Sequence, residues 1–225
     1  MSAETHFKEW AKPGPIPPGL GSPNSVFGGD GKKRLAEMGL GLPLTIEPEE
    51  TLDAISGHFR LFQLTDGHRF STDDILTAWY GTSWCPSART ALDLGSGLGT
   101  VGMICAWRLV GTSFVTIEAQ PESVVLSKKS ARYNGLTERY EIRAGDFREP
   151  GVLEDTEKFD LVTGSPPYYA VEAGVKSEHS QKRACRFELR GTVTDYCATA
   201  AKHLAPGGFF ACVFPIESAQ RARVE

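Results

Sequence analysis

The stretch 90–102, TALDLGSGLGTVG, carries the groups best suited to hold a ligand. A short apolar run contains Asp93 and is followed by Gly95, Gly97 and Gly99, after which an apolar, helix-compatible run begins. Glycines here reach backbone angles that other residues avoid, and they let a ligand approach the backbone N–H groups at the start of a helix. The pattern therefore predicts a strand, a glycine turn and a helix, with a small-molecule ligand at the turn.

Two kinds of cofactor use such a turn. Residues 97–102 read as G-x-G-x-x-G, and Glu118 lies near the distance expected of an acid that binds the ribose of NAD. Asp93 changes this reading, because a carboxylate at the mouth of a pyrophosphate site would repel the ligand. With Asp93 the turn is D-x-G-x-G-x-G, which resembles motif I of the class I S-adenosyl-L-methionine (SAM)-dependent methyltransferases. The resemblance implies that the acid faces the methionine end of the cofactor.

Polar side chains also follow the next three predicted strands: Glu118, Asp146 and Ser165. The carboxyl ends of parallel strands meet at one edge of a sheet, so we expect these groups to gather beside the glycine turn. The Glu118 carboxylate can accept hydrogen bonds from both ribose hydroxyls of a nucleoside. Asp146 suits the adenine amino group and Phe147 the adenine ring, although a solvated turn after Gly145 is the structural alternative for Asp146.

The sequence Ser165-Pro166-Pro167-Tyr168 resembles motif IV, [DNS]-P-P-[YFW], of methyltransferases that act on amino or amide nitrogens in planar systems. An exocyclic amine is a poor nucleophile because its lone pair is delocalised into the ring. Acceptors aimed at its N–H groups, here Ser165 Oγ and the Pro166 carbonyl, would draw electron density onto the nitrogen. The prolines stiffen the loop, and Tyr168 would stack on the target base. Proximity and electrostatic positioning then supply most of the catalysis, and no metal is required.

The resemblance extends to a subfamily. Gln63, residues 70–76 and residues 182–189 are similar to the bacterial tRNA adenine-N6 methyltransferases related to the valine-tRNA enzyme. This implies transfer of a methyl group from SAM to the exocyclic N6 of adenine in structured RNA such as tRNA. That family usually carries Asn at the position of Ser165, and Ser-Pro-Pro-Tyr is also familiar from cytosine-N4 DNA enzymes. The target nitrogen therefore stays open.

Two further groups have both a functional and a structural interpretation. Asp73 lies in the first turn of a predicted helix. Its carboxylate either stabilises the helix by interacting with the positive end of the helix dipole or contacts the amino-acid end of SAM. The loop after Tyr168 has more basic than acidic residues, so it either faces RNA phosphates or is an ordinary solvated loop. Its basic residues are Lys176, Lys182, Arg183, Arg186 and Arg190, of which Lys182, Arg183 and Arg186 are predicted to bind substrate.

The elements that must position these groups alternate between strand and helix from residue 90 onward. This predicts an α/β fold with a Rossmann-like, doubly wound parallel sheet. The predicted strands are 91–94, 113–117, 140–143, 159–163 and 209–214, and the predicted helices are 100–109, 121–133 and one that begins with a capping box at Thr192. Before them, residues 51–64 are predicted to form a β-hairpin with Gly57 in its turn, followed by a helix from Ser71 or Thr72.

The chain is predicted to hold one domain. Residues 1–43 are rich in glycine and proline and are expected to form a flexible N-terminal segment. Residues 44–225 form the expected methyltransferase domain, with the hairpin and helix at 44–82 and the Rossmann-like core at 88–225. Sheets of this class generally continue with strands 6 and 7, which are not visible after residue 214. We therefore expect a fragment, or a partner chain that completes the sheet, with reduced stability or activity.

Composition limits the class of protein. The net charge of −4 over 225 residues argues against non-specific coating of nucleic acid but allows a local basic surface. Five cysteines without a C-x-x-C pair indicate reduced thiols rather than disulfides or zinc. No apolar run approaches the ~20 residues that span a membrane, and the N-terminus lacks a signal-peptide pattern, so we expect a cytoplasmic protein.

Several other functions stay open on the sequence. Within the class are amino methylation of DNA, which the lack of a separate target-recognition domain disfavours, and N5 methylation of protein glutamine. Outside it are an NAD-dependent oxidoreductase and a non-catalytic RNA-binding module, the latter suggested by the expected lack of strands 6 and 7. A binding site for which SAM competes and NAD does not would distinguish a methyltransferase from an oxidoreductase. RNA binding without methyl transfer would identify the RNA-binding module.

Overall fold

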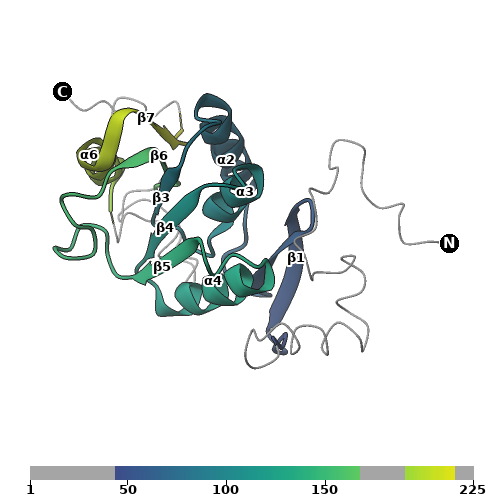
Figure 1. The fold of residues 1–225 in the computed structure, drawn as a ribbon. Coiled ribbons are helices and arrows are strands. Elements are labelled where there is room, and N and C mark those ends of the chain that lie inside the picture. Colours follow the sequence, from purple (N-terminus) through teal and green to yellow (C-terminus); the bar gives the residue numbers. More distant parts are fainter. Residues whose placement is uncertain (1–43, 168–190, 216–225) are drawn as a thin grey trace.

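A five-stranded parallel sheet forms the centre of the computed structural model, which describes residues 44–167 and 191–215 (Figure 1). The strand order is β5-β4-β3-β6-β7. The strands are β3 (Thr90–Leu94), β4 (Ser113–Glu118), β5 (Tyr140–Ala144), β6 (Phe159–Gly164) and β7 (Leu204–Cys212). The chain proceeds outward from β3 to β5 and then returns to β6 on the other side of β3. This arrangement confirms the predicted Rossmann-like α/β fold. A ligand crevice is expected where the strand order reverses, at the carboxyl end of β3.

Helices cover both faces of this sheet, because its strands alternate between two sets of buried side chains. Ala91 and Phe114 point to the face covered by three helices and the hairpin, whereas Leu92 and Val162 point to the face covered by α6. Figure 1 shows α6 on the opposite side of the sheet from α2 and α3. The helices are α2 (Thr72–Trp84), α3 (Thr100–Arg108), α4 (Pro121–Tyr133) and α6 (Val193–His203).

The predicted hairpin is present as β1 (Glu50–Ser56) and β2 (Phe59–Leu64), with Gly57 in the turn at φ 51°. Side chains of α4 and of its C-cap satisfy the backbone of β2. Ser130 Oγ accepts from the Phe62 N–H at 2.9 Å, and the Asn134 amide exchanges two hydrogen bonds with the Arg60 backbone at 2.9 and 2.7 Å. The edge of this two-stranded sheet is thereby fastened to the core rather than left open.

Element boundaries differ from the prediction mainly at β7. The predicted strand begins at residue 209, but β7 begins at Leu204, which pairs with Phe159 directly after α6. The register then shifts, so that Phe209 pairs with Leu161 and the residues between them bulge out of the ladder. Gly207 allows this bulge, since its φ of 79° lies in the left-handed region. A glycine-proline run that reads as a plain turn therefore belongs to an irregular strand.

The expectation that strands 6 and 7 are missing is not confirmed. The strands labelled β6 and β7 are the predicted strands 159–163 and 209–214, and they form one side of the described sheet next to β3. Residues 216–225 lie outside the described residues, as does the N-terminal segment 1–43. Within the described part of the chain, no helix has both the length and the apolar composition needed to cross a bilayer.

Gly102, in α3, permits close packing that a side chain would prevent. A Cβ at this position would lie 3.0 Å from Asp93 Oδ2 and would overlap the Tyr140 hydroxyl. We therefore expect Gly102→Ala to lower the free energy of unfolding by about 1–3 kcal/mol, although alanine normally stabilises a helix relative to glycine. Denaturant unfolding measures this.

The matched control is Gly111→Ala, because a Cβ at Gly111 meets no atom within 4 Å. Its unfolding free energy should stay within about 0.5 kcal/mol of wild type. Adding Tyr140→Phe to Gly102→Ala should recover part of the loss. Equal stability of the Gly102 and Gly111 variants would contradict the packing account.

Candidate functional site

A pocket of about 670 Å³ opens at the carboxyl ends of the central strands. Register explains why the two motifs meet there: Leu94 of β3 pairs with Gly164 of β6 and lies opposite Ile117 of β4. The turn after each strand therefore starts at the same level of the sheet. The predicted site residues that line the pocket are Asp73, Asp93, Gly95, Gly97, Glu118, Asp146, Phe147, Ser165, Pro166 and Pro167.

The glycine turn adopts the backbone angles that its sequence requires. Gly95, Gly97 and Gly99 have φ values of 57°, 55° and 85°, all in the left-handed region that glycine enters without a steric penalty. Gly95 and Gly97 line the pocket, but Gly99 does not: it is the N-cap of α3, and a Cβ there would lie 2.7 Å from Ser127 Oγ. The ligand surface is thus the first half of the turn, and Gly99 serves helix packing.

Asp93 is buried beneath the turn, with 1% of its surface exposed. Its Oδ2 accepts a hydrogen bond from the Gly102 N–H at 3.0 Å, and its Oδ1 accepts one from Thr163 Oγ1 at 2.8 Å. One carboxylate therefore joins the end of β3 to the first turn of α3 and to β6. The start of α3 is already occupied by this negative group, so it is poorly suited to bind a pyrophosphate.

Burial raises the pKa of the Asp93 carboxyl to about 7, although the hydrogen bonds from Thr163 and Gly102 act in the opposite direction. The carboxylates of Asp74 and Glu118 add to the rise. Burial also raises the pKa of Asp74, which caps α2 through Ser71. The pocket thus gathers several acids at low solvent exposure, and a ligand with cationic centres would relieve their mutual repulsion.

Glu118 is 5% exposed and braces the glycine turn from β4. Its Oε2 accepts from the Gly97 N–H at 2.7 Å, and its Oε1 accepts from the Gln120 N–H at 2.6 Å. Each carboxylate oxygen has more than one lone pair, so both can still accept from a pair of ribose hydroxyls. The predicted ribose contact fits this arrangement.

Asp146 is held by its neighbour. The Arg148 guanidinium donates to Asp146 Oδ1 at 2.9 Å and to Oδ2 at 2.5 Å, and the Arg148 N–H also donates to Oδ1. An amino group would have to share this carboxylate with Arg148. Phe147 beside it is buried and packs edge-on against Tyr196, with ring centroids 4.7 Å apart. An apolar wall therefore stands next to the acid, as a bound adenine would require.

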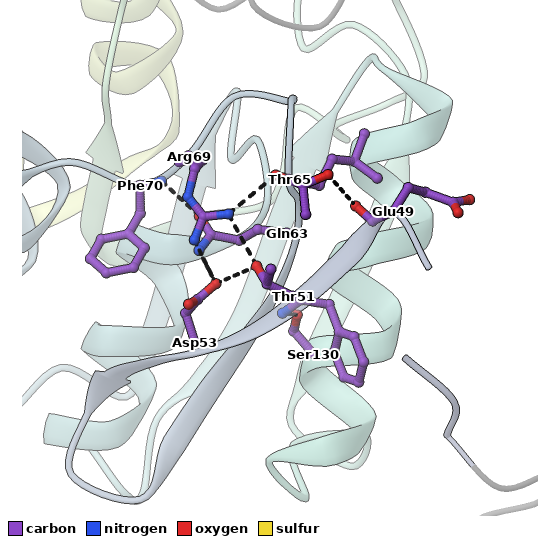
Figure 2. A network of polar contacts seen from close by, with 10 residues as sticks. Glu49, Thr51, Asp53, Gln63, Thr65, Arg69, Phe70 and Ser130 are labelled. Atoms are coloured by element: carbon purple, nitrogen blue, oxygen red, sulfur yellow. Dashed lines mark hydrogen bonds and ion pairs between the residues drawn. The ribbon is translucent and has the colours of Figure 1, made fainter. Parts of the chain in front are cut away.

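Residues of the segment between the hairpin and α2 line part of the pocket, and a polar network holds this segment (Figure 2). Gln63 is fully buried; its Nε2 donates to Asp53 Oδ2 at 2.8 Å, and its Oε1 accepts from the Phe70 N–H at 2.8 Å. Arg69 forms an ion pair with the same Asp53 oxygen at 2.8 Å and donates to Thr51 Oγ1 at 3.0 Å. The hairpin therefore positions one wall of the pocket.

Several lining residues were not predicted as site residues. Arg69, Asp74 and Tyr196 line the pocket beside the predicted set. The position of Arg69 and Asp74 within a few residues of Asp73 was the available signal. Tyr196 becomes a pocket wall through the packing of its helix, which no local pattern reveals.

Some predicted residues cannot be placed. Tyr168 and the basic residues Lys182, Arg183 and Arg186 lie outside the described residues, so the substrate side of the site stays a prediction. Among the residues that are described, no group of three or more His, Cys, Asp or Glu side chains could hold a metal ion.

Comparison with known proteins places the pocket in a family context. Residues 81–221 match the family model described as methyltransferase small domain. Among curated proteins, the chain is 26% identical over 150 residues to a tRNA1(Val) (adenine(37)-N6)-methyltransferase of Shigella dysenteriae, and 27% identical over 150 residues to one of Escherichia coli O157:H7. These alignments cover 65% of this chain but only 58% of each relative.

Solved structures show the same fold. A SAM-dependent methyltransferase from Agrobacterium tumefaciens superposes with a TM-score of 0.54 at 12% identity, covering 77% of this chain and 55% of that one. A precorrin-6y C5,15-methyltransferase from Geobacter metallireducens gives 0.50 at 11% identity, covering 72% and 71%. At these identities the likeness concerns the fold alone.

The raised pKa of Asp93 predicts a pH-dependent stability. Because the folded pKa of about 7 lies above the ordinary aspartate pKa of 3.8, the native state binds this proton more tightly than the unfolded chain between the two pH values. The free energy of unfolding should therefore fall as pH rises from about 4 to about 7, and this contribution should level off above pH 7. Asp93→Asn, which keeps the shape and one acceptor, should flatten the profile.

Melting temperatures of the unliganded protein across this range test the assignment. Asp66→Asn, a change at an exposed carboxylate, is the control and should keep the wild-type slope. Some slope should remain in Asp93→Asn, since the pKa of Asp74 is raised as well. An Asp93→Asn profile as steep as that of wild type would show that another group carries the dependence.

Proposed function

The chain belongs to the methyltransferase small domain family, whose cofactor is SAM, and on this premise we propose that it methylates the exocyclic N6 of adenine in a structured RNA, tRNA. The observation that carries the proposal is the register of β3 and β6. It sets Gly95 of the cofactor turn beside Ser165 and Pro166 in one pocket. A methyl donor and an amine acceptor held by these two turns would meet between them.

The residues around the pocket suit the two halves of SAM differently. Glu118, Asp146 and Phe147 are proposed to hold the ribose and adenine. Asp73 and Asp93, with the turn at Gly95, are proposed to face the methionine end, where the ammonium and sulfonium groups are cationic. Asp93 does so from beneath the turn, because both of its oxygens already accept hydrogen bonds from the protein.

The acceptor side is proposed to act by orienting the amine. When bound, SAM supplies an electrophilic methyl group on its sulfonium. Ser165 Oγ and the Pro166 carbonyl would accept hydrogen bonds from the two N–H groups of the adenine amine, which favours the pyramidal geometry of attack. Pro166 and Pro167 are buried and restrict the backbone that presents these acceptors. Tyr168, outside the described residues, would stack on the base.

The choice of tRNA is supported by the curated relatives, which are tRNA1(Val) adenine-N6 methyltransferases at 26–27% identity. The chain spans 58% of their length, so the activity of the whole protein belongs to the proposal. The basic residues Lys182, Arg183 and Arg186 are proposed to contact RNA phosphates. Such a substrate implies a cytoplasmic reaction. An NAD-dependent alternative is disfavoured because Asp93 already occupies the start of α3.

The proposal is tested by methyl transfer from labelled SAM to tRNA, ribosomal RNA, DNA and protein in parallel, followed by nucleoside analysis. We expect label in N6-methyladenosine from tRNA. Ser165→Ala should lower the transfer rate roughly 100-fold, the cost of one lost hydrogen bond to a group that gains charge in the transition state. Its affinity for SAM, measured by calorimetry, should change less than about threefold.

Ser87→Ala, a change at an exposed serine away from the pocket, is the control and should keep the wild-type rate. Label in DNA or in glutamine would replace the RNA proposal by one of its rivals. Wild-type turnover by Ser165→Ala would refute the assignment of the acceptor loop.

A further inference from the structure

Tyr196, on α6, is enclosed by the backbones of three glycines. A Cβ added to Gly164 would lie 2.7 Å from Tyr196 Cδ1, and one added to Gly191 would lie 3.4 Å from Cε2. A Cβ at Gly95 would overlap the Tyr196 hydroxyl. The ring therefore packs directly against main chain at each of these positions, and only 4% of the residue is exposed.

These glycines belong to the parts of the site that must work together. Gly95 is the first glycine of the cofactor turn, and Gly164 immediately precedes Ser165 of the acceptor loop. With no side chain on either glycine, the aromatic ring of Tyr196 fills the space beside both. The ring also packs against Phe147, proposed above to lie beside the adenine, with centroids 4.7 Å apart. Tyr196 is thus in contact with both functional turns.

The start of α6 holds Tyr196 in place. Thr192 and Asp195 form a capping box, in which the Thr192 N–H donates to Asp195 Oδ2 at 2.7 Å and the Asp195 N–H donates to Thr192 Oγ1 at 3.3 Å. The Tyr196 N–H donates to the Thr192 carbonyl at 3.2 Å. The ring is therefore attached to a regular helix rather than to a loop, which is the more accurate way to support a reacting group.

We infer that Tyr196 is a positioning residue that sets the separation between the cofactor turn at Gly95 and the acceptor loop at Ser165. The inference rests on the proposed function of this pocket. A methyl transfer is sensitive to this spacing, because a misplacement of about 1 Å can cost roughly 100-fold in rate. Removing the ring would leave a cavity between two glycine backbones, and such backbones are free to move into it.

The experiment compares Tyr196→Ala with Tyr196→Phe. In Tyr196→Ala we expect kcat to fall roughly 100-fold, while the Kd for SAM rises at most about fivefold. Tyr196→Phe keeps the ring against Gly164 and Gly191 and should restore kcat to within about fivefold of wild type. Tyr80→Ala is the matched control, since Tyr80 is 52% exposed on α2 and does not line the pocket; it should keep both constants.

A merely structural role predicts a different result. The folded fraction, SAM affinity and kcat of Tyr196→Ala would then fall together, and this outcome would overturn the inference. Rates are measured on whichever acceptor the wild-type protein labels, so a substrate other than tRNA changes the proposed function without removing this test.

A second readout does not depend on turnover. Crystal structures of wild type and Tyr196→Ala, each with SAM, give the Cα separation between Gly95 and Ser165. A change of about 0.5 Å or more supports the inference, since productive sites are held to about that tolerance. An unchanged separation overturns it. If the wild-type protein labels no acceptor at all, the proposed function fails and this measurement alone decides the role of Tyr196.

Discussion

The buried carboxylate of Asp93 is the constraint on which the site depends. It accepts hydrogen bonds from the backbone of α3 and from a side chain of β6, while it stands at the end of β3 itself. A carboxylate in this position is costly to bury, and its raised pKa is the measure of that cost. The hydrogen bonds from Thr163 and Gly102 offset part of this cost. They also hold together, at one point, the three elements that carry the cofactor turn and the acceptor loop.

Acidic groups dominate the pocket around this point. Glu118 braces the glycine turn through the Gly97 N–H, and Asp74 caps the helix that follows the pocket wall. These carboxylates therefore have structural duties as well as the binding roles proposed for the site. A cationic cofactor suits such a pocket because it stabilises the ionised forms that burial disfavours. The protonation of these carboxyl groups should accordingly affect both the stability of the fold and the binding of the cofactor.

The two faces of the sheet contribute different walls. On one face the hairpin, fastened to α4 and tied by Gln63 and Asp53, supports the segment that includes Arg69. On the other, α6 brings Tyr196 against glycine backbones of both functional turns. The chemistry is concentrated in two short turns, and the rest of the chain determines how those turns lie relative to each other.

The sequence by itself determined the strand-turn-helix at Asp93, the alternation that builds the sheet, the hairpin at Gly57 and the placing of Glu118, Asp146 and Ser165 at strand ends. These are local patterns, since glycine angles, side-chain alternation and helix caps depend on neighbours in the chain. It could not reveal that Gly99 serves packing or that β7 begins at Leu204 with a bulge. Nor could it show that Arg148 holds Asp146 and that Tyr196 lies between two functional turns. The last of these contacts joins residues about a hundred positions apart in the chain. Only the tertiary structure decided them, because strand register and helix packing select which surfaces meet.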